Sequence, residues 1–494
     1  MNRIYILLTV LIVLTGCHRI PDSSYQESVC PSVFPDNTEI TVPINIAPAN
    51  FLIQDEADRY LTVFEAGSEN ICINGKKVSV PVKKWRALLS QGDVTVTVYE
   101  KKSGSWKKMK PFRIYVSADK IDNYISYRVI PHSFESYQRL SINQRDLTSF
   151  DEKVIYANSM VMRDGSRQCI NCHYYKDYKT DHMQFHVRQY QGGTIFYDDG
   201  KLLKMNMNTD STLAAAVYPS WHPTHDYIAY STNKTYQIMH TVDPDRIEAL
   251  DLYSDLILYN IKDNAISVIE DSPQKLECHP AWSPDGHTLY YTSADYPEME
   301  SVNQMAVHMK EVKYNLYSKP FDPDTRAWGP TEMFFDAAAV DSSITWPKIS
   351  PDGRYMLCCI STHGVFPPYQ KVSDLFMFDL KDGTRRYVDE INSDCAESYH
   401  AWSSTGKWIV ISTRREDGIY TRLYLSHLND DGKFTKPFAL PQRDPEFNRK
   451  YLFAFNVPEF MIEPVKVSAR KLASFIKGAQ PVKVQYETKI TQAQ

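Results

Sequence analysis

The sequence predicts a mainly β protein, in which a small β-sandwich-like domain precedes a C-terminal β-propeller. Three observations lead to this prediction: 13% of the 494 residues are aromatic, tyrosines (33) far outnumber glycines (18), and the second half of the chain repeats a strand–turn–strand pattern. Aromatic residues favour strands over helices. A chain of this length exceeds one ordinary domain, so two or three domains are expected.

The repeat is the strongest of these observations. Four segments align as "YPSWHPTHDYIAYST", "HPAWSPDGHTLYYTS", "WPKISPDGRYMLCCIST" and "YHAWSSTGKWIVIST", with anchors at Trp221, Trp282, Ile349 and Trp402 that lie 61, 67 and 53 residues apart. Pro-Asp-Gly favours a turn between two strands, and a further strand pair follows each copy. Four short strands per repeat are typical of a β-propeller. We expect the propeller over residues 183–460, with five blades favoured and six as the alternative.

The region before the repeats divides into two parts. Runs such as "RYLTVFEAG" and "DVTVTVYEK" alternate like strands and predict a β-sandwich-like domain over residues 38–120. Residues 121–182 contain few prolines or glycines, and Ser149 with Glu152 matches a helical capping box. We therefore expect a mainly helical linker there, and a C-terminal tail over residues 461–494.

The first residues predict export and lipidation. Residues 1–17, "MNRIYILLTVLIVLTGC", contain one early charge and an apolar run that is too short to span a membrane. Their end, Leu-Thr-Gly-Cys, matches a bacterial lipobox, so we expect a signal peptide over 1–16, acylation of Cys17 and a tether over 17–37. The alternative is an uncleaved signal anchor. The expected location is the cell envelope, with the body anchored by lipid to a bacterial membrane and facing the periplasm, where Cys30 and Cys72 could form a disulfide.

The segment from Cys169 to His173, "CINCH", carries the most specific chemistry in the sequence. C-x-x-C-H is the attachment signature of c-type haem, in which the two thiols add to the porphyrin vinyl groups and the histidine binds the iron. The alternatives are a thioredoxin-like motif, a structural zinc site and a simple disulfide, but no βαβ setting and no second C-x-x-C supports the first two. We predict one covalent haem c on Cys169 and Cys172, with His173 as an iron ligand.

The second axial position of the iron stays open between three options. Met183 and His186 follow the motif closely, and each is a known type of haem ligand. Strand alternation places them on opposite faces, so at most one of them is expected at the iron. An open or water-ligated site is the third option.

The combined pattern resembles a known group of proteins. "AWSPDGHTLYYTS" and "ISPDGRYMLCCIS" resemble the TolB-type, WD40-like propeller repeat. With "CINCH", "RIEALDLYSDLILYN", "ESYHAWSSTGKW", "STRREDGIYTR" and "KPFALPQRDPEF", the chain resembles lipoproteins of Bacteroides-like bacteria that are often labelled cytochrome c biosynthesis proteins. The resemblance implies one haem segment between an N-terminal β region and a TolB-like propeller.

In such a propeller the strand before each anchor is the innermost. The residues three positions before the anchors would then open onto the channel and form a binding ring, and packing between blades is the alternative. These candidates, with one adjoining histidine, are Tyr218, His279, Trp346, Tyr399 and His400.

Three functions fit the sequence. The leading prediction is a membrane-anchored electron-transfer or redox-sensing protein whose propeller docks a redox or envelope protein. The alternatives are a propeller binding module for envelope proteins or glycans, and a haem peroxidase-type enzyme that uses Arg188 or His186; a non-enzymatic role is favoured. A net charge of −5 and the lack of basic blocks argue against a nucleic-acid partner. No nucleophile elbow or nucleotide fingerprint is present.

Overall fold

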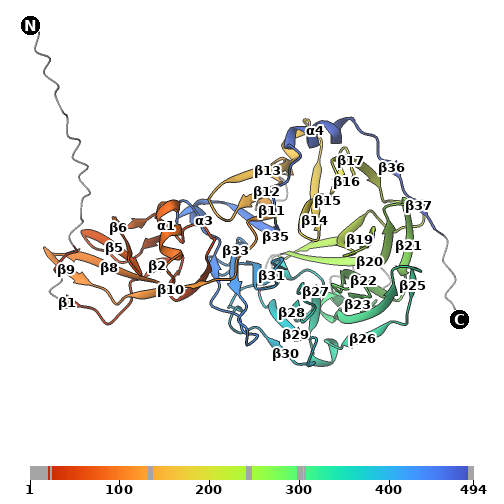
Figure 1. Cartoon of the computed structure of the whole chain (residues 1–494). Helices are drawn as coiled ribbons and strands as arrows, with labels where there is room; N and C mark the ends of the chain where they lie inside the picture. Colours follow the sequence, from red (N-terminus) through yellow and green to blue (C-terminus); the bar gives the residue numbers. More distant parts are fainter. Residues whose placement is uncertain are drawn as a thin grey trace, which may run out of the picture.

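The chain folds into an N-terminal β domain that lies beside a ring of β-sheets (Figure 1). The computed structural model describes residues 20–22, 25–131, 137–240, 247–297, 304 and 307–487. The predicted signal peptide and Cys17 lie outside this range. None of the helices in the described part is long and apolar enough to cross a membrane.

The N-terminal domain has two sheets and one helix. The larger sheet contains seven strands: β1 (Tyr25–Gln26), β3 (Ile40–Pro43), β5 (Arg59–Ala66), β6 (Glu69–Asn74), β8 (Val94–Lys102), β9 (Ser105–Lys108) and β10 (Phe112–Ser117). The smaller sheet contains β2 (Val33–Phe34), β4 (Phe51–Ile53) and β7 (Lys77–Val78). Helix α1 (Val82–Leu89) buries Trp85, Leu88 and Leu89. A β domain is thus present, but it takes in β1 and β2, which lie in the segment predicted as a tether.

In the described part of the chain the ring contains six sheets, whereas the sequence favours five blades, with six as the alternative. Sheet 1 contains β35 (Phe453–Met461), β11 (Tyr124–Pro131), β12 (Ser141–Asp146) and β13 (Glu152–Ala157). Sheet 2 contains β14 (Gln168–Lys176), β15 (Lys179–Gln189), β16 (Gly193–Asp198), β17 (Lys201–Asn206) and β36 (Val482–Lys483). Sheet 3 contains β18 (Ala216–Trp221), β19 (Tyr227–Met239), β20 (Ile247–Asn260), β21 (Ala265–Glu270) and β37 (Gln485–Tyr486).

The other three sheets follow in chain order. Sheet 4 contains β22 (Lys275–Trp282), β23 (Thr288–Asp295), β24 (Asn315–Asp322), β25 (Ala327–Trp328) and β26 (Glu332–Phe335). Sheet 5 contains β27 (Ser343–Ile349), β28 (Tyr355–Ser361), β29 (Asp374–Asp379) and β30 (Arg385–Tyr387). Sheet 6 contains β31 (Glu397–Trp402), β32 (Trp408–Thr413), β33 (Arg422–His427) and β34 (Phe438–Ala439).

The first strand of each of sheets 2 to 6 is its innermost strand, and β35 takes this place in sheet 1. These strands contact one another in the cyclic order β14, β18, β22, β27, β31, β35 and back to β14. The ring closes because β35, near the C-terminus, pairs antiparallel with β11, about 330 residues earlier. Joining the two ends of the ring in one sheet removes the exposed edges that an open array would leave.

The predicted helical linker is wrong. The described residues of 121–182, which exclude 132–136, form β11 to β14 and the start of β15, with two short 3-10 helices, η1 (Tyr137–Arg139) and η2 (Asn158–Met160). The polar run in β12 obscured its strand character, because its side chains are buried by partners distant in sequence. Arg145, for example, donates to the carbonyl of Pro441 at 2.6 Å and is 3% exposed. The propeller therefore begins near Tyr124 and not at residue 183.

The predicted C-terminal tail is structured. Helix α4 (Ala469–Gly478) is capped by the Ser468 hydroxyl, which accepts a hydrogen bond from the amide of Lys471. Strands β36 and β37 then add in parallel to the outer edges of sheets 2 and 3. A short helix α3 (Phe447–Lys450) precedes β35, and the remaining 3-10 helices are η3 (Met309–Glu311), η4 (Ala338–Val340) and η5 (Pro367–Tyr369).

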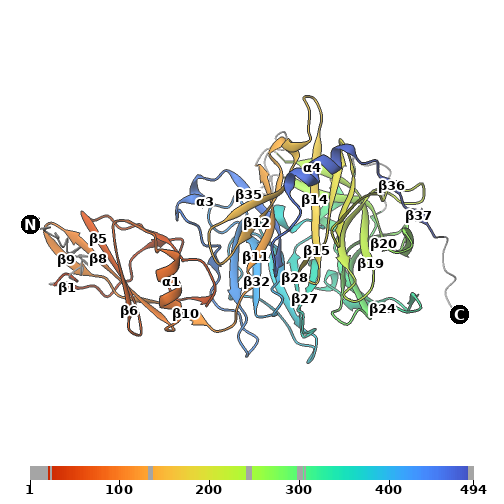
Figure 2. The same ribbon diagram turned by 45° about the horizontal axis from the view of Figure 1, so that its top comes forward.

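The N-terminal domain and the closing sheets share one hydrophobic core. Phe64 and Trp85 of the domain belong to the same buried cluster as Trp408 of sheet 6 and Phe455 and Phe460 of sheet 1. In both views the domain lies beside this part of the ring (Figures 1 and 2). Polar contacts support the junction, since the Trp408 indole nitrogen donates to the Asp119 carbonyl at 3.0 Å. The domain therefore packs directly against the point of ring closure.

Replacing Phe460 by alanine should destabilise the whole chain. Phe460 lies on β35 and is 1% exposed, so its loss removes apolar contacts from both the closure and the junction. We expect the free energy of unfolding to fall by about 3–5 kcal/mol, measured by urea denaturation. Ile462→Ala is the matched control, because Ile462 is 42% exposed, and it should change stability by about 0.5 kcal/mol. Equal effects of the two variants would contradict a closed ring.

Candidate central-channel site

Each innermost strand carries a β-bulge at the same level of the ring. In sheets 2 to 5 two residues oppose one residue of the next strand, and β35 has the same irregularity against β11. The first residues of these five bulges have positive φ angles of 50–55°: Cys172, Tyr218, His279, Trp346 and Val457. In sheet 6 the bulge is shifted by one residue, and Tyr399 takes part in it. Such angles are uncommon outside glycine and often mark functional positions.

The bulge explains the prolines of the repeat. Pro219, Pro280, Pro347 and Pro458 each follow the first bulge residue. Proline has no N–H group, so it is tolerated inside a sheet only where a ladder hydrogen bond is already missing, as in a bulge. In sheet 2 the residue at this position is His173. The "CINCH" segment is therefore the inner strand of sheet 2, and its Cys172-His173 pair corresponds to Tyr218-Pro219 of sheet 3.

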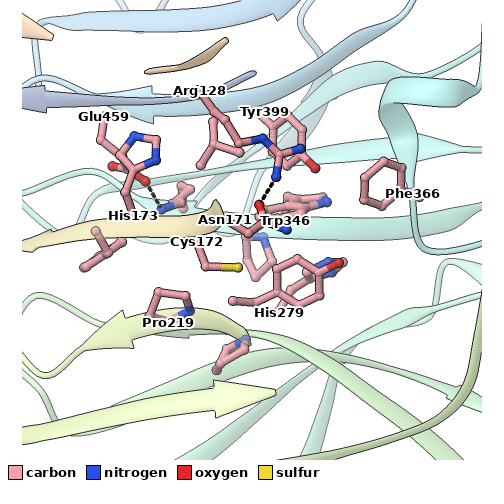
Figure 3. Close-up of a pocket in the computed structure, with 16 residues that line it drawn as sticks. Arg128, Asn171, Cys172, His173, Pro219, His279, Trp346, Phe366, Tyr399 and Glu459 are labelled. Carbon is pink, nitrogen blue, oxygen red and sulfur yellow. Dashed lines mark hydrogen bonds and ion pairs between the residues drawn. The ribbon is translucent and has the colours of Figure 1, made fainter. Parts of the chain in front are cut away.

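The bulge residues line a cavity of about 60 Å³ at the centre of the ring. Tyr218 packs against His279 and Trp346, with ring centroids 4.8 and 5.0 Å apart. Trp346 packs in turn against Tyr399 at 4.5 Å. Because Tyr218 lies on sheet 3 and Trp346 on sheet 5, these aromatic rings meet across the channel and narrow it. Figure 3 shows the sulfur of Cys172 directed toward His279 at this level.

Charged groups from three strands, which belong to two sheets, also face the cavity. Arg128 of β11 donates through Nη1 to the Asn171 side chain and, at 3.4 Å, to the Ile170 carbonyl. Lys348 of sheet 5 pairs with Glu459 of β35, with Nζ and Oε1 3.1 Å apart. Burial raises the pKa of Glu459, and the charge of Lys348 offsets part of that shift. Arg128 has no ion-pair partner among the residues that the structure describes, so the cavity carries an excess positive charge.

Two buried histidines border the cavity as neutral imidazoles. Burial lowers the pKa of His173 to about 3, helped by the charges of Arg128 and Lys348, and the Ser126 carbonyl offsets part of this shift. Burial alone lowers the pKa of His279 to about 3. His279 Nε2 and both ring nitrogens of His173 are buried without a hydrogen bond in the described part of the chain. A buried polar atom without a protein partner can be satisfied by a water or a ligand.

The cavity and the strand do not fit a covalent haem in this conformation. Residues 169–171 are paired in extended form with β15, which puts the Cα atoms of Cys169 and Cys172 roughly 10 Å apart. A helical turn would bring two such residues within about 5–6 Å. The cavity holds only about four to six water molecules, far less than a porphyrin. The chemistry of the residues is suitable, since both thiols are free and His173 is neutral, but the backbone and the available space are not.

The structure places the other predicted site residues as follows. Tyr218, His279, Trp346 and Tyr399 line the cavity, whereas His400 lies outside its lining and its Nε2 is 3.0 Å from the Leu357 carbonyl. His400 is paired with Ile411 because the bulge of sheet 6 is shifted.

Neither candidate for the second axial position lines the cavity. Met183 is 1% exposed in the hydrophobic cluster behind β14, so its thioether has a packing role. His186 is buried with Nδ1 3.1 Å from the Thr194 hydroxyl. The expected Cys30–Cys72 disulfide is absent, because the two residues pack against different clusters.

Sequence reasoning missed Arg128, Lys348, Phe366, Val457 and Glu459, all of which line the cavity. One signal was available for two of them. "VPEF" in β35 has the same form as "YPSW" and "HPAW", and it places Val457 and Glu459 at the bulge of a further inner strand. Arg128 and Phe366 had no such signal, because Arg128 lies on a second strand and Phe366 in a loop.

The comparisons with known proteins give distant matches only. No family model and no curated protein matches the chain. An ACO/RPE65 chimera matches at 12% identity over 88% of this chain and 100% of its own, with a TM-score of 0.38. Prolyl oligopeptidase B from Galerina marginata matches at 9% identity over 80% of this chain, which spans 54% of that enzyme, with a TM-score of 0.37. An ancestral GH74 enzyme matches at 6% identity over 87% of this chain and 62% of its own, with a TM-score of 0.31.

The buried imidazole of His279 should make stability depend on pH. Its pKa is about 3 in the folded chain and about 6.5 when unfolded, so below pH 6.5 the unfolded state binds the extra proton. The free energy of unfolding therefore carries no penalty from His279 above pH 6.5, and it decreases as the pH falls from 6.5 toward 3. His279→Gln should remove the dependence, so that the stability difference from wild type changes by about 2 kcal/mol between pH 7 and pH 5 in urea denaturation. The control His287→Gln removes an exposed imidazole, and an equal change in that variant would contradict the assignment.

Proposed function

We propose that this protein is a β-propeller binding module whose ligand site is the central cavity. The observation that carries this proposal is the convergence of the six inner-strand bulges on one small cavity, in which several buried polar atoms have no partner. Propeller channels and their mouths are common places for ligands, because residues from every sheet meet there. The resemblance of the repeats to TolB-type propellers supports a binding role.

The expected location gives this role a setting. The lipobox at Cys17 supports a protein anchored by lipid in the bacterial envelope, with its body on the periplasmic side. A ligand that enters the cavity would then come from the periplasm, and an envelope protein is the expected partner of the body. The charge distribution offers no basic surface for a nucleic acid.

Ligand-observed NMR tests the binding proposal. The full-length protein in detergent is mixed with pools of short organic acids, amino acids and monosaccharides, and saturation transfer is measured for each pool. At least one pool should receive saturation, and Cys172→Met should abolish the transfer because the longer side chain occupies the cavity. The control Cys395→Met changes a cysteine outside the cavity lining and should leave the transfer intact. Absence of transfer from every pool, or transfer unchanged in Cys172→Met, would contradict the proposal.

The second candidate is a covalent haem protein that transfers electrons or senses redox state. The observation that favours it is the combination of two free thiols with a neutral, buried imidazole, whose ring nitrogens have no partner within hydrogen-bond geometry among the described residues. This is the donor set that c-type attachment requires. It also requires the segment 169–173 to leave its extended conformation. The peroxidase alternative has no comparable support, because Arg188 is exposed and His186 is engaged with Thr194.

An absorption spectrum tests the haem candidate. The full-length protein, made in a host that matures c-type cytochromes, should show a Soret band that survives acid–acetone extraction. Cys169→Ala combined with Cys172→Ala should remove the band, whereas His173→Ala should keep part of the haem and lose the low-spin spectrum. The control Cys395→Ala should retain the band. A colourless protein with the mass of the bare chain would eliminate this candidate and leave the binding module.

A further inference from the structure

We propose that the central cavity binds a small organic carboxylate, with Arg128 as the group that receives its charge. This inference rests on the proposed binding function and specifies the class of ligand. The cavity has an excess positive charge, donors without acceptors, aromatic walls and little space, and each of these features restricts the ligand.

The cavity has one positive charge that no described carboxylate neutralises. Lys348 and Glu459 neutralise each other at 3.1 Å, and His173 and His279 are neutral at physiological pH. The guanidinium of Arg128 contributes one positive charge. Its Nη1 is engaged with the amide oxygen of Asn171, which is a neutral group. An anion in the cavity would therefore compensate a partly buried guanidinium that no described carboxylate compensates.

The hydrogen-bonding groups agree with an acceptor ligand. The indole nitrogen of Trp346 is a donor only, and it is buried without a partner among the described residues. Arg128 Nε is likewise buried without a partner, and His279 has an unmatched ring nitrogen. A carboxylate brings two oxygens that accept several hydrogen bonds, and the guanidinium fork matches its geometry. A cation held by the aromatic rings is disfavoured, because the charge of Arg128 would repel it.

The size and the walls of the cavity indicate an organic acid with a short apolar part. About 60 Å³ corresponds to roughly four to six water-sized atoms. The rings of Trp346 and Tyr399 line the cavity and offer apolar faces to a short carbon chain (Figure 3). Tyr218 lines the cavity as well and packs against Trp346. An inorganic oxyanion would carry the same negative charge, but it is strongly hydrated and has no apolar part to pack against these faces. A carboxylate of two to four carbons satisfies both requirements.

Isothermal titration calorimetry on the full-length protein in detergent tests this inference. Sodium propionate is compared with propionamide, its neutral isostere, and with sodium phosphate at constant ionic strength. Propionate should bind, and propionamide and phosphate should bind at least tenfold more weakly. Arg128→Gln should weaken propionate binding by roughly ten- to hundredfold, since a hydrogen bond to a charged group is lost. Arg128→Lys keeps the charge without the fork and should give a smaller loss.

The controls separate the possible outcomes. Arg113→Gln removes a positive charge in the N-terminal domain and should leave propionate binding unchanged. Equal binding of propionamide, equal binding of phosphate, or full affinity in Arg128→Gln would overturn the inference. If propionate does not bind, but the amino-acid or monosaccharide pool binds and Cys172→Met abolishes that binding, the carboxylate inference fails and the proposed binding function stands. If no pool binds, the inference and the proposed binding function both fail. Should Arg128→Gln not fold, the comparison of propionate with propionamide on the wild-type protein remains decisive.

Discussion

The pairing of β35 with β11 is the constraint on which the rest of the structure depends. It joins residues 453–461 to residues 124–131 in one sheet and so converts a row of sheets into a ring. It also brings Glu459 to within 3.1 Å of Lys348 and places Arg128 in the lining of the cavity. Without this long-range contact the inner strands would have no common centre, and the cavity residues would not meet.

The same closure connects the N-terminal domain to the propeller. Phe455 and Phe460 lie in one apolar cluster with Trp85 of α1 and Trp408 of sheet 6. A β domain of about 90 residues with a small second sheet buries part of its apolar surface only through this contact. The domain and the closing sheets therefore stabilise each other, and the domain restrains the position where the two ends of the ring join.

The inner-strand bulge relates the sequence motif to the fold. A bulge requires an unpaired residue, accepts a positive φ angle and tolerates proline, and these features recur around the channel. Cys172 and His173 take the places that Tyr218 and Pro219 take in the next sheet, so the C-x-x-C-H segment is part of the repeat and not an insertion before it. The bulges also bring one side chain from each of five inner strands to the cavity, where burial keeps His279 neutral.

The sequence by itself determined the mainly β class, the propeller repeats, the turns at Pro-Asp-Gly and four of the residues that line the cavity. These follow from local chemistry: Gly286 and Gly353 adopt positive φ angles of 76° and 73° at the turns, as this residue type allows. The strand β12 could not be predicted, because two of its buried polar side chains find partners about 300 residues away. Arg145 donates to the Pro441 carbonyl, and Gln144 accepts from the amide of Val465.

Only the tertiary structure decided how the site is assembled. Arg128, Lys348 and Glu459 come from three strands far apart in sequence, so no local pattern could place them around one cavity. The conformation of the C-x-x-C-H segment was decided in the same way, because pairing with β15 and packing against the neighbouring inner strands hold it extended. Residue types and turn signals act over a few positions along the chain. Closure of the ring and the pairing of charges in its channel instead depend on contacts that form only when the whole chain is folded.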